Sequence, residues 1–295
     1  MVQFLQQLVN GLSIGSVFAL VALGYTMVYG IIKLINFAHG DIYMLGAFVG
    51  YFSFKYIGGG IIGFVLAMVI SMLFCAVVGV LIERIAYKPL RNASRITALI
   101  TAMGVSYFLQ YVMVYLVGTD RKTLAAPFEN TVFNIGGVHF TLSTIIIVIT
   151  TIILMLLLTY IVNYTKMGKA MRAVSADADA ARLMGINVDN TISFTFALGS
   201  ALAGAAGVLI GMHYNYVEPL MGTVPGLKAF IAAVFGGIGI IPGAMLGGLS
   251  IGVIQTFASG YISSLWQDAI VYILLIVILV VKPSGLLGKN VKEKV

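Results

Sequence analysis

The sequence "LSTIIIVITTIILMLLLTYIVN" (residues 142–163) contains no charged residue, and it is followed closely by "GKAMRAVSADADAARLMGIN" (residues 168–187). About 20 apolar residues in a helix cross the roughly 30 Å hydrocarbon core of a bilayer, so the first segment predicts a membrane span. The second segment carries Lys169, Arg172 and Asp179 and is too polar to insert. The alternation predicts a helical membrane protein with a polar segment between two spans.

The composition of the whole chain agrees with this fold class. Of its 295 residues, 60% are hydrophobic and only 9% are charged, whereas soluble domains carry roughly 25% charged residues. Hydropathy predicts spans at 8–31, 35–56, 60–82, 96–118, 142–163, 191–214 and 264–281, and a broken apolar stretch at 226–258. We therefore expect an all-α, polytopic membrane protein in a single transmembrane domain (1–295), with about eight to ten transmembrane or re-entrant segments.

The positive charges predict the orientation. The net charge is +7, and the basic residues are scattered over short loops, which indicates a membrane face and no nucleic-acid partner. One set of connections carries Lys33, Arg84, Lys88, Arg91, Arg95, Lys166, Lys169, Arg172, Arg182, Lys282, Lys289, Lys292 and Lys294, and the opposite set carries only Lys55, Arg121, Lys122 and Lys228. The positive-inside rule places the first set in the cytoplasm. We expect a multi-pass protein of the inner (plasma) membrane with its N-terminus outside and its C-terminus in the cytoplasm.

The broken stretch reads "AFIAAVFGGIGIIPGAMLGGLSIG" (residues 229–252). Its hinge consists of Gly236, Gly237, Gly239, Pro242 and Gly243. Broken backbone at membrane depth is tolerated where it packs inside protein or lines a water-filled cavity, and interrupted helix ends can hold charged substrate groups. The hinge is therefore a candidate for the translocation path, and a tight helical hairpin with glycines for close packing is the alternative. With the N-terminus outside, the C-terminus lies in the cytoplasm only if this stretch leaves from the outer side and returns to it. The stretch could do so by crossing the membrane fully or by re-entering it.

A second polar interruption is "KLINFAHGDIYMLG" (residues 33–46). Asn36, His39 and Asp41 lie at or just inside a predicted span, where polar groups are costly and usually face a cavity or the bundle interior. If the segment is helical, Asn36 and His39 share a face, and the three residues are candidates for a gate or substrate path. Alternatively, the segment lies at the cytoplasmic interface, where Asp41 meets the positive end of the second helix.

The sequence offers little for an enzyme. The three histidines, His39, His139 and His213, have no metal-ligand spacing, and the chain contains no GxxxxGK[ST] loop for phosphates and no recognisable nucleophile motif. We expect no catalytic residues, no metal site and no enzymatic activity. One ion pair is suggested across the last two apolar segments, between Lys228 and Asp268.

The polar segment 168–187 has the features of a docking helix. Its alanines favour helix, and Gly185 is suited to the position just after a helix end. A short helix along the membrane surface can dock into a groove of another protein. The heptad from Asp179 to Gly185 reads D-A-A-x-x-x-G.

That heptad resembles the E-A-A-x-x-x-G loop of ABC importer permeases, with Asp in place of Glu. The stretch from Asn10 to Phe52 resembles the start of the high-affinity branched-chain amino-acid permeases, and "MGKAMRAVSADADAARLMGIN" and "KAFIAAVFGGIGIIPGAMLGG" are similar to that family's loop and late hairpin. The resemblance extends over essentially the whole chain. It implies that the loop forms a coupling helix, with Asp179, Ala180, Ala181 and Gly185 in contact with an ATP-hydrolysing subunit.

The resemblance also implies partners and a substrate class. The chain starts almost directly with its first span, as in the shorter, LivH-type permease subunit, which implies pairing with a longer LivM-type paralogue. Two ATPase subunits would bind ATP and Mg, so this chain would need no cofactor. An extracytoplasmic binding protein would deliver leucine, isoleucine or valine. Related ABC permeases for urea or short amides share these motifs, and a stand-alone secondary transporter is a further alternative.

Overall fold

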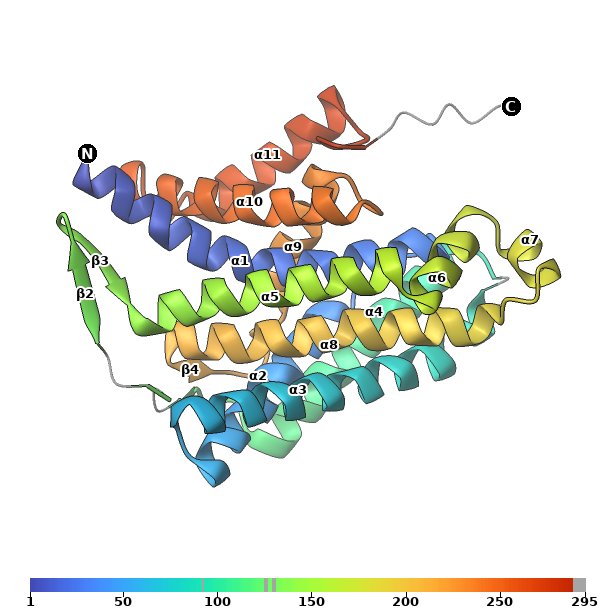
Figure 1. Ribbon diagram of the computed structural model, residues 1–295, viewed down its shortest axis with the longest axis horizontal. Coiled ribbons are helices and arrows are strands. Elements are labelled where there is room, and N and C mark those ends of the chain that lie inside the picture. The colour runs from blue at the N-terminus through green and yellow to red at the C-terminus, as the bar shows by residue number, and fades with distance from the viewer. Residues whose placement is uncertain (92, 125–126, 129–130, 289–295) are drawn as a thin grey trace.

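Long apolar helices dominate the computed structural model, which describes residues 1–91, 93–124, 127–128 and 131–288 (Figure 1). Six of them are long and apolar enough to cross a membrane: α1 (Val2–Ile32), α3 (Gly60–Ile82), α4 (Arg95–Val117), α5 (Leu142–Tyr164), α8 (Val188–Tyr214) and α10 (Ile241–Tyr261). Three further helices are α2 (His39–Ile57), α9 (Thr223–Gly236) and α11 (Gln267–Val281). These bounds confirm the polytopic helical fold class and agree with the predicted spans to within a few residues at most ends.

The remaining elements lie at the two ends of the bundle. One end carries α6 (Lys166–Ala176) and α7 (Ala178–Leu183), together with the short helices η1 (Glu83–Tyr87) and η2 (Lys88–Leu90). We call it the α7 end. The other, the hairpin end, carries the antiparallel hairpin of β2 (Val132–Ile135) and β3 (Val138–Thr141), which the sequence did not predict, and the pair β1 (Lys122–Thr123) and β4 (Tyr216–Val217). Lys289, Lys292 and Lys294, counted above among the basic residues, lie outside the described residues.

The helices form two similar sets of opposite direction. α1 runs from the hairpin end to the α7 end, and α8 runs the other way (Figure 1). α1 packs on α10 as α8 packs on α3, and α9 packs on α1 as α2 packs on α8. In chain order, one set is α1, α2 and α3, and the other is α8, α9 and α10. Each set is a long central helix followed by a short helix and a further long one. The two sets form an inverted-topology repeat of the kind seen in transporters. The segment from η1 to α7, which includes α4 and α5, connects the two sets.

Small residues hold the central helices together. A Cβ atom added at Gly46 in α2 would lie 2.5 Å from the Cα of Gly204 in α8, and one at Gly15 in α1 would lie 2.9 Å from the Cα of Leu249 in α10. Lipid gives apolar helices no hydrophobic drive to associate, so close backbone approach supplies the van der Waals contact instead. The glycines at these helix contacts therefore serve packing.

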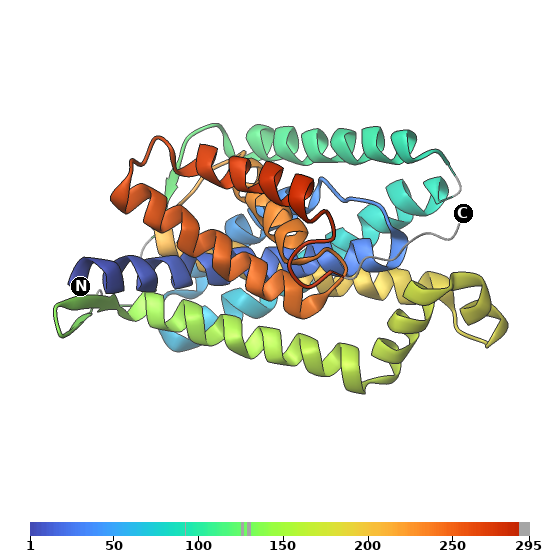
Figure 2. The same ribbon diagram turned by 90° about the horizontal axis from the view of Figure 1, so that it is seen from above.

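The broken stretch forms α9 and α10, joined by a tight turn at residues 237–240. Gly239 in this turn lies against Gly30, close to the last turn of α1. α10 follows the length of the bundle in the view of Figure 1, whereas α9 lies obliquely across it in the view of Figure 2. The stretch thus turns near the α7 end and returns toward the hairpin end.

Candidate functional site

α2 begins inside the bundle. α1 ends at Ile32, where Lys33 takes a left-handed conformation (φ 54°) and its N–H donates to the Tyr29 carbonyl at 2.9 Å. His39, the first residue of α2, packs on Gly24 of α1. Since Gly24 precedes the end of α1 by two turns, or about 12 Å at 1.5 Å per residue, the link at 34–38 folds back into the bundle.

The start of α9 meets the start of α2 at this depth. A Cβ at Gly40 would lie 2.6 Å from the Gly222 carbonyl oxygen and 3.0 Å from the Gly226 Cα. Glycine is therefore required for the two helix starts to touch. Both helices direct their N-terminal, electropositive ends toward this point.

A cavity of about 200 Å³ lies beside this junction, between α1, α2, α4 and α9. Asp41 lines it and is only 1% exposed. The Gln110 side-chain nitrogen donates to Asp41 Oδ1 at 2.9 Å and to Ser106 Oγ at 3.2 Å. No Lys, Arg or His of the described chain forms an ion pair with Asp41.

The three polar residues predicted for a gate point in different directions. Asn36 Oδ1 accepts a hydrogen bond from the Tyr87 hydroxyl at 3.1 Å, and His39 packs edge-on against the Tyr25 ring with centroids 4.7 Å apart. Asn36 and His39 were expected to share a face if their segment is helical, and that condition is not met because α2 begins only at His39. Asp41 does lie in the first turn of α2, as predicted, but that turn is buried and not at an interface.

The glycine hinge is separate from the Asp41 cavity. The turn needs glycine at Gly237 and Gly239, whose φ angles are 113° and 90°. The carbonyls of Phe235 and Gly236, which end α9, accept hydrogen bonds from the N–H groups of Leu286 and Leu287 at 2.8 and 3.1 Å. Close packing therefore accounts for the hinge glycines and for Gly243, whose carbonyl approaches Gly236. A role for these residues and Pro242 in the translocation path stays a prediction.

The predicted docking helix consists of two helices that meet at Asp177. The Asp177 carboxylate accepts hydrogen bonds from the N–H groups of Asp179 and Ala180, both at 2.9 Å, and so starts α7. At the other end, Gly185 N–H donates to the Arg182 carbonyl and Ile186 N–H to the Ala181 carbonyl, at 3.0 and 3.1 Å. This is a Schellman motif with Gly185 (φ 82°) at its left-handed position, so the predicted helix stop at Gly185 is confirmed.

α7 presents a mixed surface. Asp179 and Ala180 are exposed, and Ala181 is buried. Leu183 and Met184 are 89% and 83% exposed. An exposed apolar pair among charged residues is typical of a surface that docks to another protein.

Two polar anchors lie at the α7 end: one holds α6 to the bundle, and the other holds the start of α8. In the first, Ser175 Oγ in α6 donates to the Gly30 carbonyl of α1 at 2.7 Å, and Arg172 donates to the Val162 carbonyl of α5. A cavity of about 220 Å³ separates α6 from Gly239 of the hinge. The hydrogen bond of Ser175 thus joins α6 directly to the last turn of α1.

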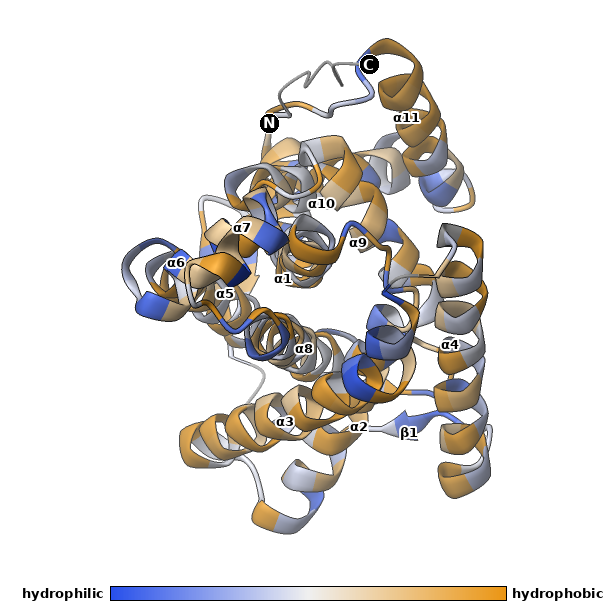
Figure 3. Ribbon diagram, turned by 90° about the vertical axis from the view of Figure 1, so that its right-hand side faces the viewer, coloured by the Kyte–Doolittle hydropathy of each residue, from blue (hydrophilic) through white to orange (hydrophobic). Residues whose placement is uncertain are grey.

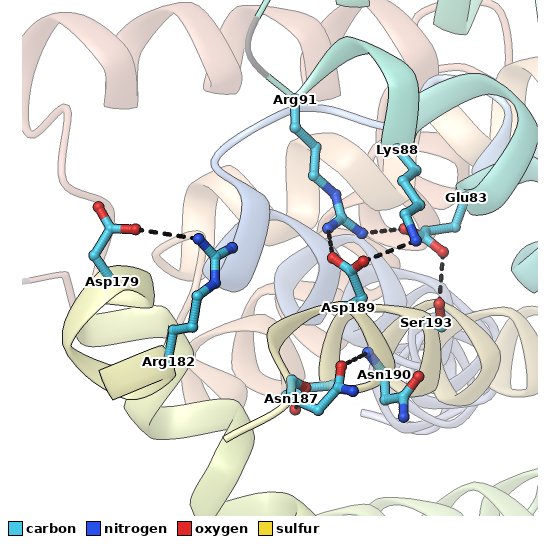
Figure 4. A network of polar contacts seen from close by, with 10 residues as sticks. Glu83, Lys88, Arg91, Asp179, Arg182, Asn187, Asp189, Asn190 and Ser193 are labelled. Carbon is cyan, nitrogen blue, oxygen red and sulfur yellow. Dashed lines mark hydrogen bonds and ion pairs between the residues drawn. The ribbon is translucent and has the colours of Figure 1, made fainter. Parts of the chain in front are cut away.

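The second anchor is an ion-pair network at the first turn of α8 (Figure 4). Asp189 pairs with Lys88 at 2.7 Å and with Arg91 at 2.5 Å. Arg91 also pairs with Glu83, whose side chain is fully buried, and Ser193 Oγ donates to Glu83 Oε2 at 2.6 Å. The network joins α8 to the connection between α3 and α4.

Sequence reasoning missed several of these residues. Gln110 is a lone amide within the predicted span at 96–118, and the cost of an intramembrane polar group was a usable signal for it. Lys228 was assigned wrongly to an outer loop, since it lies in α9 and is 5% exposed. Its predicted partner is confirmed: Lys228 Nζ lies 2.6 Å from Asp268 Oδ1.

Together, a bundle with an inverted repeat, a polar interior cavity and an anchored surface segment define a membrane transport protein. The family described as "Branched-chain amino acid transport system / permease component" matches residues 7–279. The chain belongs to this family of permeases.

Named relatives agree over the full length. The chain is 44% identical to the high-affinity branched-chain amino acid transport system permease protein LivH of Escherichia coli (strain K12), over 99% of this chain and 98% of that protein. It is 42% identical to the corresponding permease protein BraD of Pseudomonas aeruginosa, with the same shares covered. A probable branched-chain amino acid transport permease protein LivH of Methanocaldococcus jannaschii is 30% identical over 93% of this chain and 89% of that protein. All three relatives are described as branched-chain amino acid transport permease proteins.

Proposed function

We propose that this chain is the membrane-spanning subunit of an ATP-driven importer for leucine, isoleucine and valine. The observation that carries the proposal is the chain-wide identity to permeases of branched-chain amino acid systems. The partners would be a longer LivM-type permease, two ATPase subunits that bind ATP and Mg, and an extracytoplasmic amino-acid-binding protein.

The α7 end would face the cytoplasm and the ATPases. Hydrophilic residues occur on α6 and α7 in the view of Figure 3, which looks at this end. The described basic residues on this side are Lys33, Arg84, Lys88, Arg91, Lys166, Lys169, Arg172, Arg182 and Lys282. The positive-inside rule supports a cytoplasmic position for them, with the N-terminus outside and the C-terminus inside.

The mechanism would be mechanical. An ATPase subunit would hold α7 through Leu183, Met184 and the exposed Asp179. Closure of the ATPases on ATP would move α6 and α7. The hydrogen bond of Ser175 would pass the motion to α1, and the short link at 184–187 would pass it to α8. The bundle would then shift between outward-open and inward-open states, as in other two-state transporters.

A matched pair of substitutions tests this mechanism. Gly185→Val places a β-branched residue at a φ of 82°, which such residues rarely adopt. We expect leucine uptake by the reconstituted complex to fall about tenfold or more, while ATP hydrolysis continues and the subunit stays inserted. Gly104→Val makes the same change in α4, where no atom lies within 4 Å of an added Cβ, and uptake should be unchanged.

Other outcomes would contradict the proposal. Normal uptake in Gly185→Val would remove the coupling role of α7. Uptake of urea in place of leucine would change the substrate class, and uptake driven by an ion gradient without ATP would identify a secondary transporter.

A further inference from the structure

Asp41 is a buried carboxyl group for which the described part of the fold supplies no cation. It is 1% exposed, accepts a hydrogen bond from Gln110 and forms no ion pair among the described residues. A buried carboxylate at membrane depth is costly unless a cation pairs with it. Asp41 lines a cavity, so a bound cation can reach it.

The neighbouring polar atoms fit a group that only donates hydrogen bonds. The Gln110 side-chain nitrogen is used by Asp41 and Ser106. The Gln110 carbonyl oxygen therefore remains as an acceptor, and it accepts no hydrogen bond from the described side chains or backbone. A primary ammonium has three donors and no acceptor, so it complements these two oxygens.

The rest of the cavity fits the other parts of an amino acid. Thr223, the first residue of α9, lines the cavity at the electropositive start of the helix, a position that favours a carboxylate. The lining also includes four large apolar residues: Phe37, Met103, Leu227 and Phe230. The cavity of about 200 Å³ suits a small aliphatic side chain.

We propose that this cavity binds the transported amino acid during its passage, with the ammonium group on Asp41 and Gln110, the carboxylate at the start of α9 and the aliphatic side chain against α4 and α9. The inference rests on the proposed function, because it takes an aliphatic amino acid as the substrate. It assigns the binding to this cavity and not to the hinge at 236–243.

Photolabelling of the assembled permease–ATPase complex, purified without the binding protein, tests the assignment. The probe is a diazirine analogue of leucine, which keeps both charged groups. We expect labelled peptides from α4 and α9, at Met103, Tyr107, Leu227 or Phe230. Asp41→Asn should reduce the labelling about tenfold or more, the scale of a charge-assisted hydrogen bond. Asp41→Glu should retain more labelling than Asp41→Asn, and Asp120→Asn, at an exposed loop position, should have no effect.

Competition by leucine fragments identifies the group that Asp41 binds. 3-Methylbutylamine keeps the ammonium group and 4-methylpentanoate keeps the carboxylate. We expect the amine to reduce labelling of the wild-type complex at least tenfold more effectively than the acid. Labelling at the hinge, equal labelling of Asp41→Asn, or better competition by the acid would overturn the inference. Leucine uptake by the wild-type complex with its binding protein tests the proposed function separately, so the two can fail independently.

Discussion

Asp41 and Glu83 are both buried carboxylates, 1% and 0% exposed, yet their surroundings differ. Glu83 pairs with the Arg91 guanidinium and accepts a hydrogen bond from Ser193. Asp41 accepts a hydrogen bond from the neutral Gln110 amide. The comparison separates two uses of buried charge: Glu83 is neutralised inside the fold and joins helices, whereas Asp41 remains available to a cation from outside.

The pair of Lys228 and Asp268 belongs with Glu83. Lys228 lies in the second turn of α9 and is 5% exposed, and Asp268 supplies its counter-charge at 2.6 Å. The cavity of Asp41 and the cavity that Lys228 lines touch different residues of the same helix. α9 therefore lies between the neutralised charge of Lys228 and the carboxyl group of Asp41, which has no cation partner among the described residues.

The largest effect is expected from Arg91→Met. This change leaves the Glu83 charge buried without its cation, which typically costs about 3–5 kcal/mol. The thermal midpoint of the detergent-solubilised complex, followed by size-exclusion chromatography after heating, measures the loss. The double variant Glu83→Gln with Arg91→Met removes the stranded charge and should recover most of it. An unchanged midpoint in the single variant would show that Glu83 is not held as an ion in the fold.

A smaller loss is expected from Asp268→Asn. The substitution strands the Lys228 ammonium, but the Asp268 side chain is 40% exposed, and water screens the pair in part. We expect a destabilisation of about 2 kcal/mol, between the values for exposed and buried pairs. The same thermal assay measures it, with Asp120→Asn as a control at an exposed loop. A loss as large as that of Arg91→Met would place Lys228 in a drier environment than its partner's exposure indicates.

The difference between these sites also marks the limit of the sequence. Hydropathy predicted the spans and the broken stretch because the length of an apolar segment is a local property of the sequence. The helix stop at Gly185 was predicted because it also depends only on neighbouring residues. The partners of Asp41 and Glu83 were not predicted. Gln110 and Asp41 come from different helices, and Asp189 meets Arg91 only because α8 packs on α3. Lys228 was assigned to a loop because a single charged residue among apolar ones indicates the end of a membrane span. The ion pair with Asp268, which allows the charge to be buried, appears only in the folded chain.

The smallest change in stability is expected from Asp41→Asn. The amide has the same shape, its oxygen can still accept from Gln110, and no cation is left unpaired. Burial of a neutral amide costs less than burial of a carboxylate, and this gain offsets the lost attraction to the starts of α2 and α9, about 0.3–1 kcal/mol each. We therefore expect the free energy of unfolding to stay within about 1 kcal/mol of the wild-type value.

The thermal assay used for Arg91→Met also decides this case. A loss as large as that of Arg91→Met would mean that the two helix starts already use the Asp41 charge, and Asp41 would then resemble Glu83. An unchanged midpoint together with lost photolabelling would place the charge of Asp41 in substrate binding and not in the stability of the bundle.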